Sequence, residues 1–131
     1  MIEIGAKYCA EETVTDAATA AAVGSGGLCV YATPRMAALM ENAAYNCLAP
    51  MLDEGQTSVG TALNIAHTSA TPVGLRVTAE AELTAVSENG KLVDFKLTAR
   101  DETGVIGEGT HRRAIVNTER FLAKCEAKRA K

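Results

Sequence analysis

His67 is the side chain in this 131-residue sequence that is best suited to move a proton near neutral pH. It ends a stretch, residues 59–67, that is typical of a β-strand, in which alternate side chains share one face. The odd-numbered positions of this stretch are Val59, Thr61, Leu63, Ile65 and His67. The imidazole therefore continues an apolar row toward the core or a cleft. Two interpretations stay open here: a hydrogen-bonded core histidine and an acid–base catalyst.

Glu41 is a second titratable residue in an unexpected place. Thr33 followed by Pro34 predicts the start of a helix, and Gly55 predicts that it ends shortly before. On a helical wheel Glu41 falls inside the apolar arc, which consists of Met36, Met40, Ala43, Ala44, Cys47, Leu48, Met51 and Leu52. It is either a buried functional carboxylate or a residue at the edge of the stripe with its head group in water.

Thr33 also allows two interpretations, a helix cap and a nucleophile. Eight residues separate it from Glu41, which is about 12 Å along a helix axis, so contact between the two needs a third group. A hydroxyl, an imidazole and a carboxylate together would supply a nucleophile, a base and an orienting group. The spacing makes such a set possible without establishing it.

The elements that must position these residues follow one order: a strand, a long helix, four antiparallel strands and a short helix. We predict strands over residues 6–14, 59–67, 75–86, 91–100 and 105–116, the long helix over residues 33–52, and a last helix capped by Thr118. Strict alternation over residues 75–86 indicates a half-buried strand, and Asn89 followed by Gly90 predicts a tight hairpin. One helix against one curved antiparallel sheet buries both apolar faces. This is an α+β hotdog fold in a single domain over residues 1–131, and its open sheet edges favour a dimer.

Composition excludes several classes of function. With 16 acidic and 13 basic residues the net charge is −3, which argues against nucleic acid as a partner. The four cysteines are scattered, so we expect no metal site and reduced thiols in a cytoplasmic protein. We identify no signal peptide and no apolar run long enough to cross a membrane. The glycine-rich residues 24–27 lack the Lys-Ser/Thr ending of a phosphate loop and predict a bend.

Three segments together resemble the fluoroacetyl-CoA thioesterase-like family of hotdog-fold enzymes. They are residues 31–41, 59–72 and 107–113, and the similarity runs from about Leu28 to the C-terminal helix. The resemblance implies that Thr33, Glu41 and His67 are the catalytic residues. It also implies hydrolysis of a short-chain acyl-CoA thioester near the interface of a homodimer or a dimer of dimers. No cofactor is then needed, because CoA is part of the substrate.

The resemblance suggests a role for each residue. His67 would act as general base toward Thr33 or a water, then as acid toward the leaving thiolate. Glu41 would orient and charge the imidazole or take part directly. Gly60 would let the substrate carbonyl approach a main-chain N–H, which would serve as an oxyanion donor. Whether Thr33 becomes acylated stays open.

Other residues are expected near the substrate or in the packing. We assign Thr68 and Arg112 to substrate binding. Because Arg112 and Arg113 alternate faces, each is either solvated or paired with a carboxylate or a CoA phosphate. His111, on a strand with two glycines, is expected to pack structurally.

The segment before the helix departs from the family. The enzyme that names the family carries a phenylalanine in a lid there that favours its fluorinated substrate, whereas residues 24–28 contain no aromatic side chain. We therefore expect a general or a different short-acyl thioesterase. Two other classes stay open: a non-catalytic acyl-CoA-binding hotdog domain, and a hotdog enoyl-CoA hydratase or dehydratase.

Overall fold

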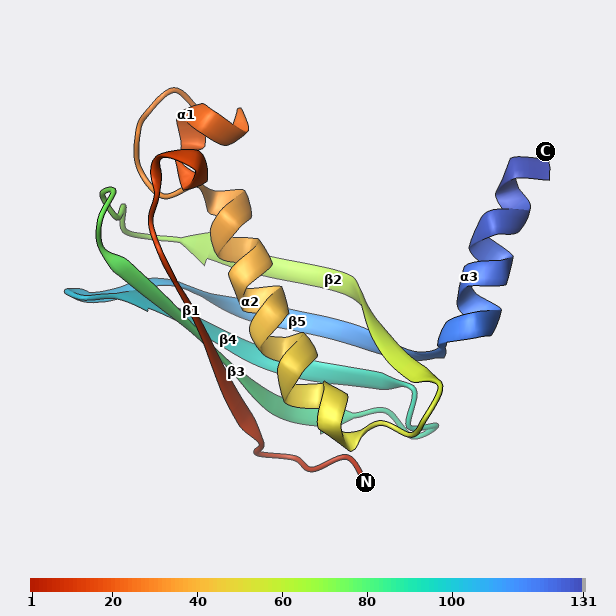
Figure 1. Cartoon of the computed structure of the whole chain (residues 1–131). Coiled ribbons are helices and arrows are strands. Elements are labelled where there is room, and N and C mark those ends of the chain that lie inside the picture. The colour runs from red at the N-terminus through yellow and green to blue at the C-terminus, as the bar shows by residue number, and fades with distance from the viewer. Residues whose placement is uncertain (131) are drawn as a thin grey trace.

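The computed structural model describes residues 1–130 and shows a curved antiparallel sheet that packs around one long helix, α2 (Thr33–Leu48) (Figure 1). The strands are β1 (Lys7–Thr13), β2 (Gln56–His67), β3 (Arg76–Val86), β4 (Leu92–Asp101) and β5 (Gly104–Asn117). Their spatial order is β1-β3-β4-β5-β2, so β1 and β2 form the two edges. The remaining helices are α1 (Ala20–Val23) before α2 and α3 (Thr118–Glu126) after β5. The predicted α+β arrangement is confirmed.

The ends of the helices differ from the prediction. α2 ends at Leu48 and continues as a 3-10 turn, Ala49–Met51, because Pro50 has no N–H to extend the α-helical ladder. Ala32 is the N-cap of α2, so Thr33 is the first helical residue and its hydroxyl does not cap the helix. Asn117, rather than Thr118, caps α3 by accepting a hydrogen bond from a main-chain N–H.

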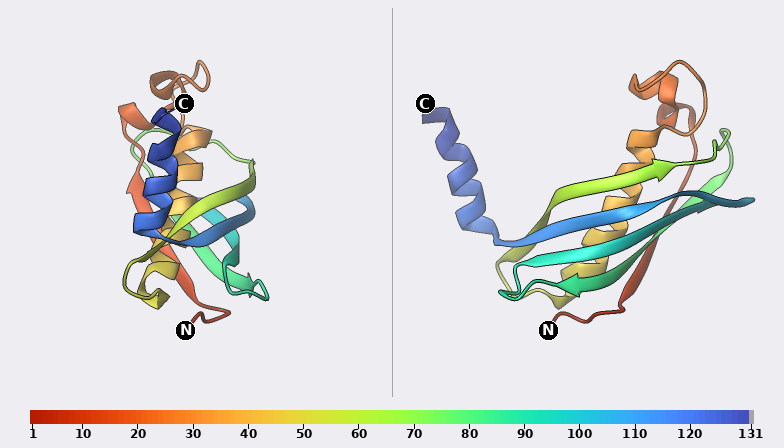
Figure 2. Two further views of the ribbon diagram at one scale, coloured as in Figure 1. Left: turned by 90° about the vertical axis from the view of Figure 1, so that its right-hand side faces the viewer. Right: turned by 180° about the vertical axis from the view of Figure 1, so that it is seen from behind.

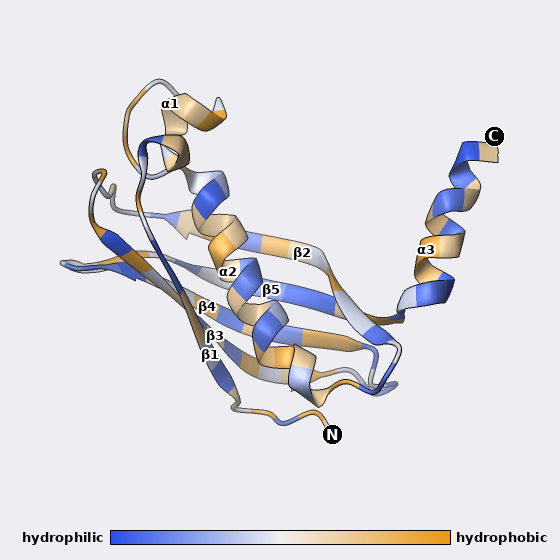
Figure 3. Cartoon of the chain, viewed as in Figure 1, coloured by the Kyte–Doolittle hydropathy of each residue, from blue (hydrophilic) through white to orange (hydrophobic). Residues whose placement is uncertain are grey.

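The core lies between α2 and the inner face of the sheet. α2 packs mainly on β1 and β3, and it leaves the β5–β2 side of this face less covered. Apolar and polar residues alternate along the strands, as a half-buried sheet requires (Figure 3). The buried hydrophobic side chains of β3, β4 and β5 are Val77, Ala79, Ala81, Leu83, Val93, Phe95, Leu97, Ala99 and Ile106. Several are alanines, which lets the helix approach the sheet closely.

A β-bulge changes which side chains of β2 face the helix. The register of β2 against β5 shifts between Gly60 and Ala62, so Thr61 is an extra residue. Gly60 and His67 consequently both lie on the inner face, whereas Val59 lies on the outer face. The prediction that Val59 and His67 share a face is wrong, because a period-two pattern assumes an unbroken ladder.

The β2 edge carries two exposed features. Within residues 1–130, β2 pairs only with β5, and its Leu63 is 38% exposed. α3 leaves the sheet beside this edge and stands away from the rest of the chain (Figures 1 and 2). Among residues 1–130, no helix is both long and apolar enough to span a bilayer.

Replacing Leu97 with alanine should lower the free energy of unfolding by about 2–5 kcal/mol, because the side chain is fully buried in β4 and leaves a cavity. Leu122→Ala is the matched control: this leucine of α3 is 59% exposed, so the change should stay below about 0.5 kcal/mol. Urea unfolding followed by circular dichroism measures both. A loss below about 1 kcal/mol for Leu97→Ala would contradict the packing.

Candidate active site

Thr33 and His67 come together where the start of α2 meets the end of β2. The hydroxyl Oγ1 of Thr33 lies 2.7 Å from Nδ1 of His67. Because Ala32 provides the N-cap, this hydroxyl is available for the imidazole. In the tautomer that carries its proton on Nε2, Nδ1 accepts the hydroxyl proton. This is the geometry of a nucleophile or substrate-binding hydroxyl beside a general base.

The surroundings keep the His67 ring neutral. Burial lowers its pKa below the usual 6.5, and the nearby main chain of Ser69 acts in the opposite direction and by less. The edge of the ring meets Tyr31, with ring centres 6.4 Å apart. Nε2 is buried and has no hydrogen-bond partner among residues 1–130. A buried polar atom without a partner is costly, so Nε2 is the atom at which a further group is expected.

The carboxylate of Glu12 links β1 to the residues at the start of α2. It accepts hydrogen bonds from the Tyr31 hydroxyl at 2.5 Å and from the Arg35 guanidinium at 2.6 Å. Tyr31 in turn contacts the His67 ring. Glu12 on β1 therefore holds Tyr31 in place beside the His67 ring.

Glu41 does not approach His67 within one chain. Its Oε2 lies 4.0 Å from Nη1 of Arg113, and its side chain is 43% exposed, which agrees with the second of its two interpretations, a residue at the edge of the apolar stripe. It also lies over Gly60, where an added Cβ would be 2.7 Å from Oε2. Gly60 and His67 are seven residue steps apart along the strand, which is about 23 Å. The structure thus pairs Thr33 with His67 and places Glu41 at the other end of the strand.

Arg113, which the sequence left as either solvated or paired with a carboxylate or a CoA phosphate, is a buried residue with several polar partners. Its side chain is 8% exposed and donates to Ser58 through Nε, 2.8 Å from Oγ, and through Nη2, 3.0 Å from the main-chain oxygen. Nη1 lies 3.1 Å from Nε2 of His111, and the guanidinium lies over the ring of Tyr45 at 5.6 Å. Burial lowers the pKa of Arg113, while the charge of Glu41 acts in the opposite direction. The alternation of Arg112 and Arg113 was the available signal, but only the pairing of β5 with β4 shows that Arg113, opposite the buried Val93, is the one that faces inward.

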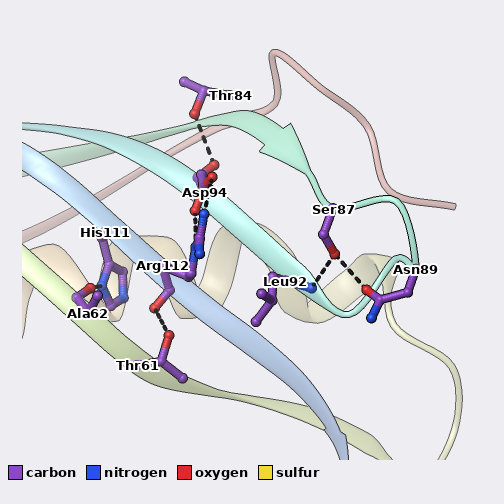
Figure 4. A network of polar contacts seen from close by, with 9 residues as sticks. All are labelled: Thr61, Ala62, Thr84, Ser87, Asn89, Leu92, Asp94, His111 and Arg112. Atoms are coloured by element: carbon purple, nitrogen blue, oxygen red, sulfur yellow. Dashed lines mark hydrogen bonds and ion pairs between the residues drawn. The ribbon is translucent and has the colours of Figure 1, made fainter.

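Arg112 lies on the outer face of the sheet. It forms a two-pronged ion pair with Asp94, 2.7 Å from Nε to Oδ1 and 3.1 Å from Nη2 to Oδ2. Figure 4 shows Arg112 extended toward Asp94 and His111 turned toward Ala62. The structure therefore does not bring Arg112 to the other candidate residues, and Arg113 takes the inward position.

The other expected substrate-binding residues have structural partners. Thr68 donates its main-chain N–H and its hydroxyl to the carbonyl oxygen of Ile106, at 2.7 and 3.2 Å, and so ties the end of β2 to β5. The space at Gly60 that was assigned to a substrate carbonyl is approached by Glu41, His111 and Arg113. Among residues 1–130, no three metal-ligating side chains form a group.

The segment before α2 lies at the Thr33 end of the helix. α1 and the loop that follows it stand over this end in Figure 1. Gly24 ends α1 in the left-handed conformation, and Leu28 is 71% exposed. This segment is therefore placed to border whatever approaches Thr33 and His67.

Comparisons with known proteins identify the family. The model of the fluoroacetyl-CoA-specific thioesterase family matches residues 14–119, a range that contains Thr33, Glu41 and His67. A fluoroacetyl-CoA thioesterase of Streptantibioticus cattleyicolor is 44% identical over 99 residues, covering 76% of this chain and 70% of that protein.

Solved structures agree with this assignment. A structure of the fluoroacetyl-CoA thioesterase matches with a TM-score of 0.90 at 35% identity and covers 98% of both chains. A thioesterase superfamily member from Thermus thermophilus matches with a TM-score of 0.91 at 26% identity, covering 99% of this chain and 95% of that one. The predicted hotdog fold is confirmed. The chain belongs to the fluoroacetyl-CoA-specific thioesterase family and is a hotdog-fold acyl-CoA thioesterase.

Proposed function

We propose that this protein hydrolyses short acyl-CoA thioesters at sites that combine Thr33 and His67 of one protomer with the partner's Glu41 in a homodimer. One observation carries the proposal: Nε2 of His67 is buried without a hydrogen-bond partner in the described residues 1–130, while the carboxylate of Glu41 lies near the other end of β2 in the same chain. A relative solved with acetyl-CoA supports a short acyl group.

The edge strand β2 suggests how two protomers would associate. A long exposed edge offers unpaired N–H and C=O groups to a second strand, and self-pairing about a two-fold axis is antiparallel. An axis near Leu63 would bring Gly60 and Glu41 of one protomer close to the partner's His67. The bulge at Thr61 supports this arrangement, because Gly60 and His67 then lie on the same face of the joined sheet. A dimer of dimers would repeat the same pairing.

The proposed reaction follows from these positions. His67 takes a proton from Thr33 or from a water through Nδ1, and the activated oxygen attacks the thioester carbonyl. The partner's Glu41 accepts the Nε2 proton in a hydrogen bond and stabilises the imidazolium that forms. The imidazolium then protonates the sulfur as the C–S bond breaks. Where Thr33 is the attacking group, His67 then activates a water that hydrolyses the acyl ester of Thr33 and restores its hydroxyl. By either route one water is consumed, and the products are CoA and the free acid.

We further propose a cytoplasmic location. The four cysteines are free thiols and form no disulfide within residues 1–130, which is consistent with a reducing compartment.

Replacing His67 or Thr33 with alanine should lower kcat for acetyl-CoA hydrolysis by about 100-fold or more, because each change removes one member of the base–hydroxyl pair. Release of CoA measured with a thiol reagent gives the rates. Thr110→Ala, at an exposed position of β5, is the control and should keep the wild-type rate. Wild-type rates in both active-site variants would reject the mechanism, and binding of acetyl-CoA without turnover by the wild type would indicate a binding module.

Mixing two inactive variants tests whether protomers share a site. His67→Ala and Glu41→Gln should each be impaired, whereas their mixture after joint refolding should regain about a quarter of wild-type activity. Half of the dimers are then mixed, and each mixed dimer holds one intact site. Size-exclusion chromatography confirms the dimer. A mixture no more active than its components would place all three residues in one chain.

The lid composition predicts substrate preference. Without an aromatic side chain over residues 24–28, the ratio of kcat/KM for fluoroacetyl-CoA to that for acetyl-CoA should stay within about 10-fold. A panel of acetyl, propionyl, butyryl and fluoroacetyl thioesters, with enoyl-CoA to detect hydration, measures this. Strong selectivity for the fluorinated ester would show that other residues recognise fluorine.

A further inference from the structure

His111 is a buried histidine whose two ring nitrogens have fixed roles. The ring is 3% exposed, and Nδ1 lies 2.8 Å from the main-chain oxygen of Ala62. A carbonyl oxygen only accepts hydrogen bonds, so Nδ1 carries the proton. Nε2 lies 3.1 Å from Nη1 of Arg113, and a guanidinium only donates. His111 is therefore the neutral tautomer that donates through Nδ1 and accepts through Nε2.

The acceptor on His111 fixes one edge of the Arg113 guanidinium. Ser58 holds the other edge through Nε and Nη2. The group is thus oriented from both sides, and Nη1 is also the atom that lies 4.0 Å from Oε2 of Glu41. His111 determines where Nη1 points, and Nη1 is the closest positive group to the Glu41 carboxylate.

Gly60 allows these groups to converge. A Cβ at this position would lie 2.7 Å from Oε2 of Glu41, 3.2 Å from Cε1 of His111 and 3.5 Å from Nη1 of Arg113. The charged and titratable groups that face His111 are Arg113 on its own strand and Glu41 on α2. β2 contributes the Ala62 carbonyl, and β4 contributes the ring of Phe95, 6.2 Å away.

We infer that His111 is a positioning residue for the proposed thioesterase: its neutral ring accepts a hydrogen bond from Arg113 and so holds the guanidinium against Glu41. The inference rests on the proposed function, in which Glu41 acts on the partner's His67. If Nε2 of His111 were protonated, it and Nη1 of Arg113 would both be donors, so the hydrogen bond between them would be lost and Arg113 would no longer be held. Burial lowers the pKa of His111 most, which keeps the acceptor available at neutral pH.

Two substitutions separate the two contacts of His111. In H111Q the side-chain oxygen can take the place of Nε2 and accept from Arg113, but the donor to Ala62 is lost. In H111N the amide nitrogen can take the place of Nδ1 and donate to Ala62, but Arg113 loses its acceptor. We expect kcat for acetyl-CoA to fall about 10-fold or more in H111N and less than about 3-fold in H111Q, with KM changed less. Equal losses in the two variants would overturn the inference.

A double variant tests whether the loss of kcat in H111N depends on Arg113. Arg113→Met keeps an unbranched side chain and removes the guanidinium donors, so adding H111N should cause no further loss of kcat. A further loss in the double variant would show that His111 acts by another route. Thermal unfolding by circular dichroism shows whether each variant is folded.

If H111N does not fold, the pH dependence of kcat in the wild type and in H111Q tests the role of His111. In the wild type, protonation of His111 and of His67 should both lower kcat at acid pH, whereas in H111Q only His67 titrates. The acid limb of H111Q should be shallower, and an unchanged limb would overturn the inference. Failure of the proposed function is distinguishable: the wild type would bind acetyl-CoA without turnover if the hydrolysis is wrong, and Glu41→Gln would keep full activity if the role of Glu41 is wrong. Failure of this inference alone leaves Glu41→Gln impaired and H111N active.

Discussion

The close approach of α2 to the sheet is the constraint on which the rest of the structure depends. Fully buried alanines such as Ala79 and Ala99 line the sheet beneath the helix. Gly107 lies so near Met36 that a Cβ there would be 2.7 Å from its sulfur. Protein interiors of this density do not yield without cost, so the helix axis is fixed. The first residue of that helix consequently reaches His67 at hydrogen-bond distance.

The polar cluster around Arg113 lies where the apolar contact between helix and sheet ends. α2 covers β1 and β3 more fully than β5 and β2, and the inner face there carries charged and polar side chains. A buried guanidinium is tolerated only when its donors are used, and Ser58, His111 and Glu41 meet Arg113 from three elements. The same contacts that satisfy Arg113 also orient it toward the carboxylate.

Local patterns predicted the order of the strands and helices, because this order follows from periodicity within each segment. They left Glu41 open between a buried carboxylate and a residue at the edge of the apolar stripe. The face of Val59 could not be predicted in this way, because it depends on an extra residue in β2, and a bulge is defined by the pairing of two strands rather than by either one. The inward position of Arg113 could not be predicted either, because it depends on the register of β5 with β4, in which Arg113 pairs with the buried Val93. The hydroxyl of Thr33 was ambiguous for a similar reason: cap and catalytic positions differ by one residue at a helix start. The family resemblance supplied the pairing of Thr33 with His67 that spacing left open.

The bulge at Thr61 has a consequence for how this protein can evolve. It sets the phase between the two ends of β2, so that both ends present their side chains to the same face. Insertion or deletion of a single residue between positions 60 and 67 would reverse that phase and turn one end outward. Length variation is therefore tolerated only outside this stretch. Residues 24–28 lie outside β2, in the loop near the N-terminal end of α2, so their length and composition can vary without changing this phase.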